Sequence, residues 1–327
     1  MATIADIAKM AGVAKSTVSR YLNGGSISQE TRRKIESVIE ETGYSPNKFA
    51  QSLKAKRTNI IGTIIPRLDS YAASQTLIGI DEKLRELDYQ MIISNTSQDL
   101  EREIENIYHL AKQKVAGIIL LATEITTSHL EAFQKVNIPV ILVGQQHDRF
   151  HSVIHNDYEA AYELGRYILN KGHRKIAYLG VTEKDIAVGI KRKEGFKRAV
   201  NEEPNCRVRF FETSFKIEDS IKKVPEIINE FHPTVIVCAT DNIALGALKS
   251  AHMMGLRIPE DLSISGFGGY DVTGLTYPGI TTAKFYYREA GNQAATNMVR
   301  LVNEEELDQL TISTYNIIER ESVDSKV

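Results

Sequence analysis

The chain has 327 residues, 42% of them hydrophobic and 25% charged, and its formal net charge is −2. A chain of this length can form two or three domains with sizeable cores. The sequence contains neither a run of ~18 apolar residues nor the apolar core of a secretory signal, so membrane insertion and secretion are not expected. Two cysteines, Cys206 and Cys238, are too few for a disulfide framework and fit a reducing cytoplasm.

The charge is distributed unevenly along the chain. Residues 1–57 hold ten Lys and Arg against five Asp and Glu, a net charge of +5, so the remainder carries about −7. A basic N-terminal segment on an acidic body is typical of a nucleic-acid-binding protein that presents one end to the phosphates. The alternative is a solvated helical segment with ordinary surface charge.

The N-terminal segment predicts three short helices. Thr3 can cap the first, with Asp6 three residues later as the acid of a capping box, and Gly12 ends this helix at a turn. A second helix follows the turn directly. Ser28 can cap a third helix, which Gly43 stops. The first two helices and the tight turn between them predict a helix-turn-helix.

The second predicted helix, from Lys15 to Leu22, has one apolar and one polar side. Val18 and Leu22 are four residues apart and turn inward, which leaves Lys15, Ser16 and Arg20 projecting outward. A short exposed helix with basic and hydroxyl residues near its N-terminus suits the major groove of DNA, where the base edges can be distinguished. We therefore expect this helix to read base sequence.

A short fourth helix is predicted at about residues 46–54, after a Ser-Pro pair that suits a helix start. About two helical turns do not persist alone in water, so this helix would fold only on a partner. Leu53 would share a face with Ala50 and Lys54, and an apolar residue among basic ones suits a wedge in the minor groove. A plain interdomain linker is the alternative.

Two runs in this segment match a known family. They are D-I-A-x-x-A-G-V-x-x-x-T-V-S-R from Asp6 to Arg20 and S-P-N-x-x-A-x-S-L-K from Ser45 to Lys54, and a strand beginning at Ile60 follows them. With these residues the chain resembles the LacI/GalR family of bacterial repressors over essentially its whole length. The resemblance implies a cytoplasmic homodimer whose recognition helices read a pseudo-palindromic operator, and whose paired hinge helices open the central base step.

The resemblance and the helix pattern together give a set of expected DNA contacts. The predicted DNA-binding residues are Lys15, Ser16, Thr17, Arg20, Asn23, Tyr44, Asn47, Ala50, Leu53 and Lys54. The residue inserted between base pairs would be Leu53. Ala14 departs from the family pattern, because a Ser usually precedes the recognition residues there.

From Asn59 onward, short apolar runs alternate with longer amphipathic ones, which is typical of parallel βαβ units. The predicted strands are 60–65, 90–94, 117–121, 139–143, 175–179, 208–211, 234–238 and 263–266, with a further strand near 315–318. Predicted helices include 100–114, 158–171, 188–201 and 241–254. Residues 143–156 interrupt this alternation and are interpreted as a connection between two halves, although Val153 and Ile154 have strand character.

The predicted fold class is α/β. An all-α helix-turn-helix headpiece with a hinge helix (1–57) precedes an effector-binding and dimerisation core (58–327) of two doubly wound parallel-sheet subdomains, like those of periplasmic binding proteins. The family architecture implies three crossings between the halves, near Asn156, Ala283 and Ser313. The expected N-subdomain is therefore about 58–155 and 285–313, and the expected C-subdomain is about 156–284 and 314–327.

A cleft between the two halves is the expected ligand site, because ligands of such sheets bind beyond the carboxyl ends of the strands. The predicted effector-binding residues are Arg67, Asp69, Ser70, Gln145, Arg192, Thr240, Asp241 and Phe267. Arg192 offers a two-pronged donor for hydroxyls, carboxylates or phosphates. Asp241 either accepts hydrogen bonds from sugar hydroxyls or caps the helix that it begins.

The family resemblance extends to the effector site. Arg192 matches an effector-linked arginine in the family motif R-x-x-G-F, whereas Gly268 stands where many relatives carry a ligand-binding Asp. The runs that begin at Arg67, Tyr178 and Ala239 resemble the trehalose-repressor branch, in which an arginine at the position of Arg67 would suit the phosphate of a phosphorylated disaccharide. The expected effector is thus a sugar or sugar phosphate.

Other chemistries have little support in the sequence. His147, His151 and His155 are four residues apart, but a strand would spread them over more than ~25 Å, so no metal site is predicted. No phosphate-binding loop or catalytic nucleophile motif is present, and neither a cofactor nor an enzymatic activity is expected. Two alternatives remain: a catabolite-regulator-like repressor whose corepressor is a phosphorylated carrier protein, and a free-standing carbohydrate-binding protein or enzyme.

Overall fold

The computed structural model describes residues 2–22, 25–44 and 58–326. The chain forms two compact units, Met1–Thr58 and Asn59–Val327, which are called the headpiece unit and the core unit below and are described separately. The predicted hinge helix at 46–54 lies outside the described residues. Within the described residues, no helix combines the length and the apolar character that crossing a bilayer requires.

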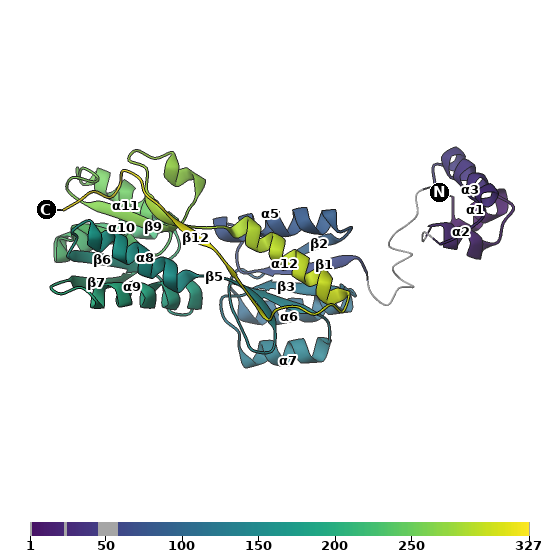
Figure 1. The fold of residues 1–327 in the computed structure, drawn as a ribbon, viewed down its shortest axis with the longest axis horizontal. Coiled ribbons are helices and arrows are strands. Elements are labelled where there is room, and N and C mark those ends of the chain that lie inside the picture. The colour runs from purple at the N-terminus through teal and green to yellow at the C-terminus, as the bar shows by residue number, and fades with distance from the viewer. Residues whose placement is uncertain (1, 23–24, 45–57, 327) are drawn as a thin grey trace. The chain divides into compact units, whose positions relative to one another are not determined.

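Among the described residues of the headpiece unit are the helices α1 (Ile4–Met10), α2 (Lys15–Leu22) and α3 (Gln29–Thr42) (Figure 1). The predicted caps are confirmed. Thr3 and Asp6 form a reciprocal capping box on α1, Ser28 accepts a hydrogen bond from Thr31 N at the start of α3, and Gly43 ends α3 with a φ of 60°. This left-handed conformation is the one that glycine adopts without strain.

A small apolar core holds these helices together. Ile7 of α1, Val18 of α2 and Ile35 of α3 are completely buried, with Val38 beside them. The first turn of α2 begins at Ala14, whose carbonyl accepts from the backbone N–H of Thr17 at 2.9 Å. Since an alanine methyl cannot accept a hydrogen bond, the departure from the family's Ser removes a side-chain cap from α2.

The N-subdomain of the core unit is built on an all-parallel sheet with the order β11-β5-β4-β3-β1-β2. Its strands are β1 (Ile60–Ile65), β2 (Gln90–Asn95), β3 (Gly117–Leu121), β4 (Val140–Val143), β5 (His151–His155) and β11 (Leu310–Ser313). Its helices are α5 (Tyr71–Glu86), α6 (Leu100–Lys112), α7 (Thr127–Val136) and α12 (Tyr287–Val302). Helices α5 and α12 cover one face of the sheet, and α6 and α7 cover the other.

The C-subdomain has a second sheet with the order β12-β10-β9-β8-β6-β7, parallel except for β12. Its strands are β6 (Lys175–Gly180), β7 (Arg207–Glu212), β8 (Val235–Cys238), β9 (Ser263–Gly268), β10 (Thr281–Phe285) and β12 (Tyr315–Ile318). Its helices are α8 (Asp157–Asn170), α9 (Arg192–Asn201), α10 (Ile217–Phe231) and α11 (Asp241–Met253), with a π-helix at Ile186–Lys191 and a 3-10 turn at Asp271–Gly274. The predicted α/β fold with two doubly wound subdomains is confirmed.

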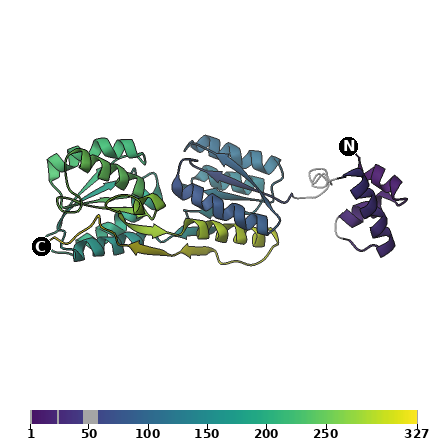
Figure 2. The same cartoon turned by 90° about the horizontal axis from the view of Figure 1, so that it is seen from above.

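The chain passes between the subdomains three times, at Asn156, Tyr286 and Thr314. The second passage lies three residues beyond Ala283, because β10 continues to Phe285. Figure 2 shows the passing segments side by side along one edge of the core unit. Residues 143–156 lead to the first passage at Asn156, and the strand character of Val153 and Ile154 belongs to β5, which the predicted strands omit and which pairs with β4 and with β11 from the end of the chain.

Helices α5 and α12 approach each other through two glycines, and both figures show the helices side by side. A Cβ on Gly79 would lie 1.9 Å from the carbonyl oxygen of Arg288, and one on Gly291 would lie 2.1 Å from that of Thr76. No side chain fits at either position, so the two helix backbones are in direct contact. This contact joins the middle of α5 to the first turns of α12, and Thr76 of α5 and Tyr287 of α12 line the cleft described next.

Candidate functional site: the cleft between the subdomains

Two adjoining cavities lie in the core unit where strands of both subdomains end. Their empty volumes are about 630 and 520 Å³, part of which is open solvent. The residues that line both are Pro66, Ser70, Ala72, Thr123, Asp185, Val188, Arg192 and Tyr287. Because these residues are shared, the two cavities are parts of one cleft. The cleft lies at the carboxyl ends of the parallel strands, where the fold class places its ligands.

Arg192 is the buried cation of the cleft, with only 4% of its surface exposed. Its Nε donates to a carboxylate oxygen of Asp157 and its Nη1 to the carbonyl of Ala239, each at 2.7 Å. Its guanidinium also lies 4.8 Å from the ring centre of Phe285 and 5.4 Å from that of Phe267. Burial acts to lower the pKa of Arg192, but the charge and hydrogen bond of Asp157, together with Tyr287 and Tyr270, outweigh burial and raise that pKa. The side chain is therefore a fixed positive charge.

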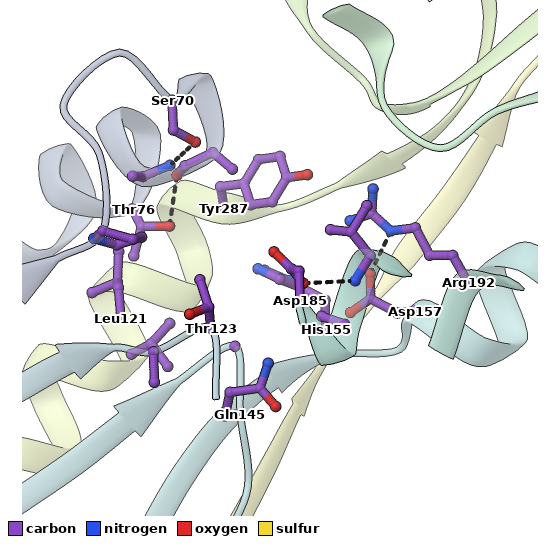
Figure 3. Close-up of a pocket in the computed structure, with 18 residues that line it drawn as sticks. Ser70, Thr76, Leu121, Thr123, Gln145, His155, Asp157, Asp185, Arg192 and Tyr287 are labelled. Carbon is purple, nitrogen blue, oxygen red and sulfur yellow. Dashed lines mark hydrogen bonds and ion pairs between the residues drawn. The ribbon is translucent and has the colours of Figure 1, made fainter. Parts of the chain in front are cut away.

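The position of Arg192 is set by an unusual helix start. Asp185 caps the π-helix by accepting from the backbone N–H of Val188 at 2.9 Å, and the π-helix leads directly into α9, whose first residue is Arg192. A Cβ on Gly189 would lie 2.1 Å from the carbonyl oxygen of Thr182, so this turn requires glycine. Figure 3 shows Asp185, Asp157 and Arg192 together on one side of the pocket. π-helices are rare and occur frequently at functional sites.

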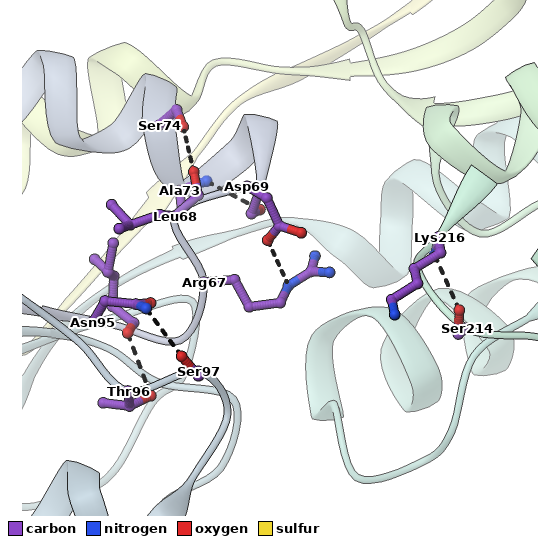
Figure 4. A network of polar contacts seen from close by, with 12 residues as sticks. Arg67, Leu68, Asp69, Ala73, Ser74, Asn95, Thr96, Ser97, Ser214 and Lys216 are labelled. Carbon is purple, nitrogen blue, oxygen red and sulfur yellow. Dashed lines mark hydrogen bonds and ion pairs between the residues drawn. The ribbon is translucent and has the colours of Figure 1, made fainter. Parts of the chain in front are cut away.

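Arg67 is the second cation and lies just after β1. Its Nε is 3.8 Å from a carboxylate oxygen of Asp69, whose side chain is 75% exposed, while that of Arg67 is 21% exposed. Its guanidinium is 4.8 Å from the ring centre of Phe215 of the other subdomain. Figure 4 shows Arg67 facing Lys216 across the gap between the subdomains. The long ion pair with Asp69 thus neutralises Arg67 only weakly, and Asp185 lines the same cavity as Arg67.

Polar groups of the N-subdomain line the remainder of the first cavity. Gln145, which follows β4, is 7% exposed, and Thr123 follows β3. Ser70 caps α5, where its oxygen accepts from the backbone N–H of Ala73 at 3.3 Å. Its hydroxyl proton therefore remains available to a ligand. The cleft thus combines hydrogen-bonding side chains with two arginines, which suits a polyhydroxylated ligand.

The sequence-based assignment of Asp241 requires correction. Asp241 is completely buried and lines neither cavity. It accepts from the backbone N–H of Tyr270 at 2.8 Å and from the Thr282 hydroxyl at 2.6 Å. The cap of α11 is its neighbour Thr240, which accepts from Ile243 N at 3.3 Å and does line the second cavity. Burial raises the pKa of Asp241 to about 6, and its role is to hold the turn after β9.

Two further predicted residues lie away from the cavity walls. Phe267 belongs to β9 itself and is completely buried, so it lies against Arg192 without lining either cavity. Asp69 lines neither cavity and acts through its ion pair with Arg67. The structure places the other predicted residues on the cleft: Arg67, Ser70, Gln145, Arg192 and Thr240.

Gly268 stands where many relatives carry a ligand-binding Asp, and the structure gives a steric reason for the glycine. Gly268 has a φ of 138°, and a Cβ there would lie 2.3 Å from Cε1 of Tyr270. The ring of Tyr270 stacks on that of Tyr71 with their centres 4.2 Å apart, and the Tyr71 hydroxyl donates to Asp271 at 3.1 Å. The space beside Gly268 is thus filled by an aromatic contact that joins the two subdomains. An aspartate at this position would disrupt that contact.

Several cleft residues were missed by the sequence analysis. His155 and Asp185 follow the same rule as the predicted residues, since each lies at or just after the end of a strand. Tyr270 lies two residues beyond β9 and obeys the same rule, whereas Tyr287 gave no such signal because β10, the strand before it, was not among the predicted strands. Figure 3 shows the Tyr287 hydroxyl pointing toward the side of the pocket that holds Arg192.

The headpiece unit presents the second candidate site. Lys15, Ser16 and Arg20 of α2 are exposed, as the helix pattern predicts, and Thr17 is half-buried. Tyr44 packs at the edge of the headpiece core. The remaining predicted contacts lie outside the described residues: Asn23, Asn47, Ala50, Leu53 and Lys54.

A helix-turn-helix unit followed by a core with a polar cleft between two subdomains defines the class of DNA-binding repressors that respond to small ligands. Family models support this on both units. Residues 3–47 match the bacterial regulatory proteins of the lacI family, and residues 58–320 match the periplasmic binding proteins and sugar binding domain of the LacI family. The chain belongs to the LacI family of bacterial regulatory proteins, and the resemblance found in the sequence is confirmed.

Relatives and solved structures agree with this assignment. The chain is 42% identical to the sucrose operon repressor of Staphylococcus xylosus over 95% of its own length and 97% of that protein. It is 29% identical to catabolite control protein A of Priestia megaterium over 97% of both chains. The crystal structure of the lac repressor dimer bound to operator and the anti-inducer ONPF has the same fold, with a TM-score of 0.91, 23% identity and 99% coverage of both chains.

Proposed function

We propose that the protein is a homodimeric repressor of a carbohydrate-utilisation operon, and that a sugar or sugar phosphate bound in the cleft lowers its affinity for a pseudo-palindromic operator. The observation that supports this most strongly is the cleft itself, where a buried, fixed arginine and several hydrogen-bonding side chains from both subdomains meet. The family assignment supplies the DNA-binding role. No catalytic step is assigned to the cleft.

The proposed effector is a disaccharide of the sucrose type, in its phosphorylated form. The relative with 42% identity is named a sucrose operon repressor, which favours a carbohydrate over the phosphorylated carrier protein of a catabolite regulator. Arg67 supports the phosphate, because its guanidinium lines the second cavity together with Arg192 and its ion pair with Asp69 is long, at 3.8 Å. Arginine matches the geometry of phosphate oxygens.

The proposed control follows from thermodynamic linkage. A ligand that contacts both subdomains binds best to one arrangement of them. If that arrangement differs from the one that binds DNA, the ligand must weaken DNA binding. The size of this effect equals the difference between the ligand's affinities for the two arrangements. Arg67, Gln145 and Ser70 from one subdomain and Arg192 and Thr240 from the other are the proposed effector contacts.

A thermal-shift screen tests the effector class directly. Purified full-length protein is heated with sucrose, trehalose and other disaccharides, each as the free sugar and as its 6-phosphate. A ligand bound only by the folded state raises the unfolding temperature in proportion to the logarithm of its concentration. The proposal predicts the largest rise for sucrose 6-phosphate, and it fails if no sugar or sugar phosphate raises the unfolding temperature.

The phosphate assignment has a separate test in Arg67→Ala. This variant should lose affinity for the phosphorylated sugar steeply and for the neutral sugar only slightly. Arg85→Ala is the matched control, since Arg85 lies on α5 of the same subdomain, outside the cleft, with its side chain 68% exposed. Equal losses for both forms, or tighter binding of the neutral sugar by the wild-type protein, would remove the phosphate from the proposal.

A further inference from the structure

Charge divides the cleft into two parts. Arg67 lines only the second cavity, where Asp69 neutralises it weakly at 3.8 Å. Arg192 and Asp185 line both cavities, but Asp157, which pairs with Arg192 at 2.7 Å, lines only the first. A negatively charged group therefore meets excess positive charge only on the Arg67 side. The first cavity suits an uncharged part of a ligand.

His155 lies in the wall of this first cavity with its hydrogen bonding incomplete. It is the last residue of β5, and its ring is held edge-on against Tyr287, with ring centres 4.9 Å apart, and 5.4 Å from the ring centre of Phe285. Its Nδ1 is shielded from solvent and has no hydrogen-bond partner among the described residues. The aromatic neighbours thus fix the ring without satisfying its polar atoms.

The protonation state of His155 decides which ligand group it suits. Burial, together with the positive charge of Arg192, lowers the pKa of His155 to about 3, so the imidazole is neutral at physiological pH. A neutral imidazole has one donor and one acceptor nitrogen, and the partner of one nitrogen normally fixes the role of the other. Because no described residue pairs with Nδ1, this nitrogen is able to act either as the donor or as the acceptor. A hydroxyl group, which both donates and accepts, is the matching partner.

We propose that His155 is a specificity-determining residue that hydrogen-bonds one hydroxyl group on the uncharged ring of a disaccharide effector. This inference rests on the proposed function and adds the orientation of the disaccharide in the cleft. The uncharged ring occupies the first cavity, beside His155 and Gln145, and the phosphate lies toward Arg67. An unpaired buried polar group costs free energy, so a ligand that supplies its partner is favoured over one that lacks it.

The test asks whether the loss of binding affinity caused by removing one sugar hydroxyl disappears when the imidazole of His155 is also removed. Affinities of the full-length wild-type protein, His155→Leu and His155→Gln are measured by calorimetry for sucrose and for its monodeoxy derivatives. The matched control is Thr76→Val, because Thr76 lines the same cavity but its hydroxyl already donates to the Ala72 carbonyl at 2.9 Å.

The inference predicts that the wild-type protein binds one monodeoxy derivative roughly tenfold more weakly than sucrose. His155→Leu should bind sucrose and that derivative equally, His155→Gln should keep part of the preference, and Thr76→Val should keep all of it. If His155→Leu retains the wild-type preference at every position, the inference is wrong while the proposed function stands. If the wild-type protein binds no sugar and no sugar phosphate, the proposed function fails and the inference with it.

Discussion

Replacement of Arg192 by Met should destabilise the core unit by roughly 3–5 kcal/mol at neutral pH. Arg192 is 4% exposed and donates to Asp157 and to the Ala239 carbonyl, each at 2.7 Å. Methionine fills much of the same space but leaves the Asp157 carboxylate, 5% exposed, buried without a counter-charge. Removal of one partner from a buried ion pair costs this much because the remaining charge is desolvated and unpaired.

The loss should also depend on pH. Burial raises the pKa of Asp157 above its ordinary value of 3.8, and Arg192 supplies the charge that opposes this rise. Without Arg192 the folded variant holds the Asp157 proton to still higher pH than the folded wild-type protein does. The free energy of unfolding of the variant, relative to wild type, should therefore fall as pH rises above the raised pKa that Asp157 has in wild type, and should recover on acidification.

Denaturant unfolding of the full-length protein at pH 5 and pH 8 measures both effects. Arg192→Met should show a larger loss at pH 8 than at pH 5, and a second substitution, Asp157→Asn, should restore part of it. Arg198→Met is the matched control on α9, since its side chain is 45% exposed and its ion pairs should contribute less than about 1 kcal/mol. A loss below about 1 kcal/mol in Arg192→Met, or equal losses at the two pH values, would refute the argument.

Three further substitutions probe other parts of the account. Arg20→Ala should weaken operator binding by roughly 1–3 kcal/mol and relax the preference at one base pair, whereas a uniform loss on all DNA sequences would make Arg20 a phosphate contact. Gly268→Asp should lower the thermal unfolding temperature, because its Cβ would lie 2.3 Å from Tyr270, and adding Tyr270→Ala should recover part of the loss; an unchanged temperature would contradict this. His173→Gln should reduce the loss of stability that acidification from pH 6.5 to pH 4 causes, since burial lowers the pKa of His173 to about 4 and only the unfolded state gains the proton in that range. If the free energy of unfolding of this variant and that of wild type depend equally on pH, His173 has no such effect.

Much of the fold could be predicted because its local signals agree with one another. The capping box of Thr3 and Asp6 and the glycine stop at Gly43 mark helix ends through backbone chemistry that acts within a few residues. Buried parallel strands such as β3 and β8 are short continuous apolar runs, as strands covered on both faces must be. These features need no knowledge of distant contacts.

The missed elements depend on contacts between distant parts of the chain. β5 is a strand because β11, more than 150 residues later, pairs with it, and the residues between β4 and β5 contain polar and glycine positions that hide this pairing. Asp241 follows a strand, as a ligand-binding residue should, yet Tyr270 and Thr282 occupy its carboxylate. The orientation of a side chain after a strand is set by such partners, which local sequence does not reveal.

Control of DNA binding by a sugar in the cleft can be measured as the effect of the sugar on operator affinity. The purified full-length protein first selects a pseudo-palindromic operator from random-sequence DNA. Its affinity for that operator is then measured by fluorescence anisotropy with and without saturating sucrose 6-phosphate, and its affinity for the sugar phosphate is measured with and without operator. The account predicts that the sugar phosphate weakens operator binding about tenfold or more and that the operator weakens sugar binding by the same factor. An operator affinity that stays unchanged while the sugar phosphate is bound would contradict the account.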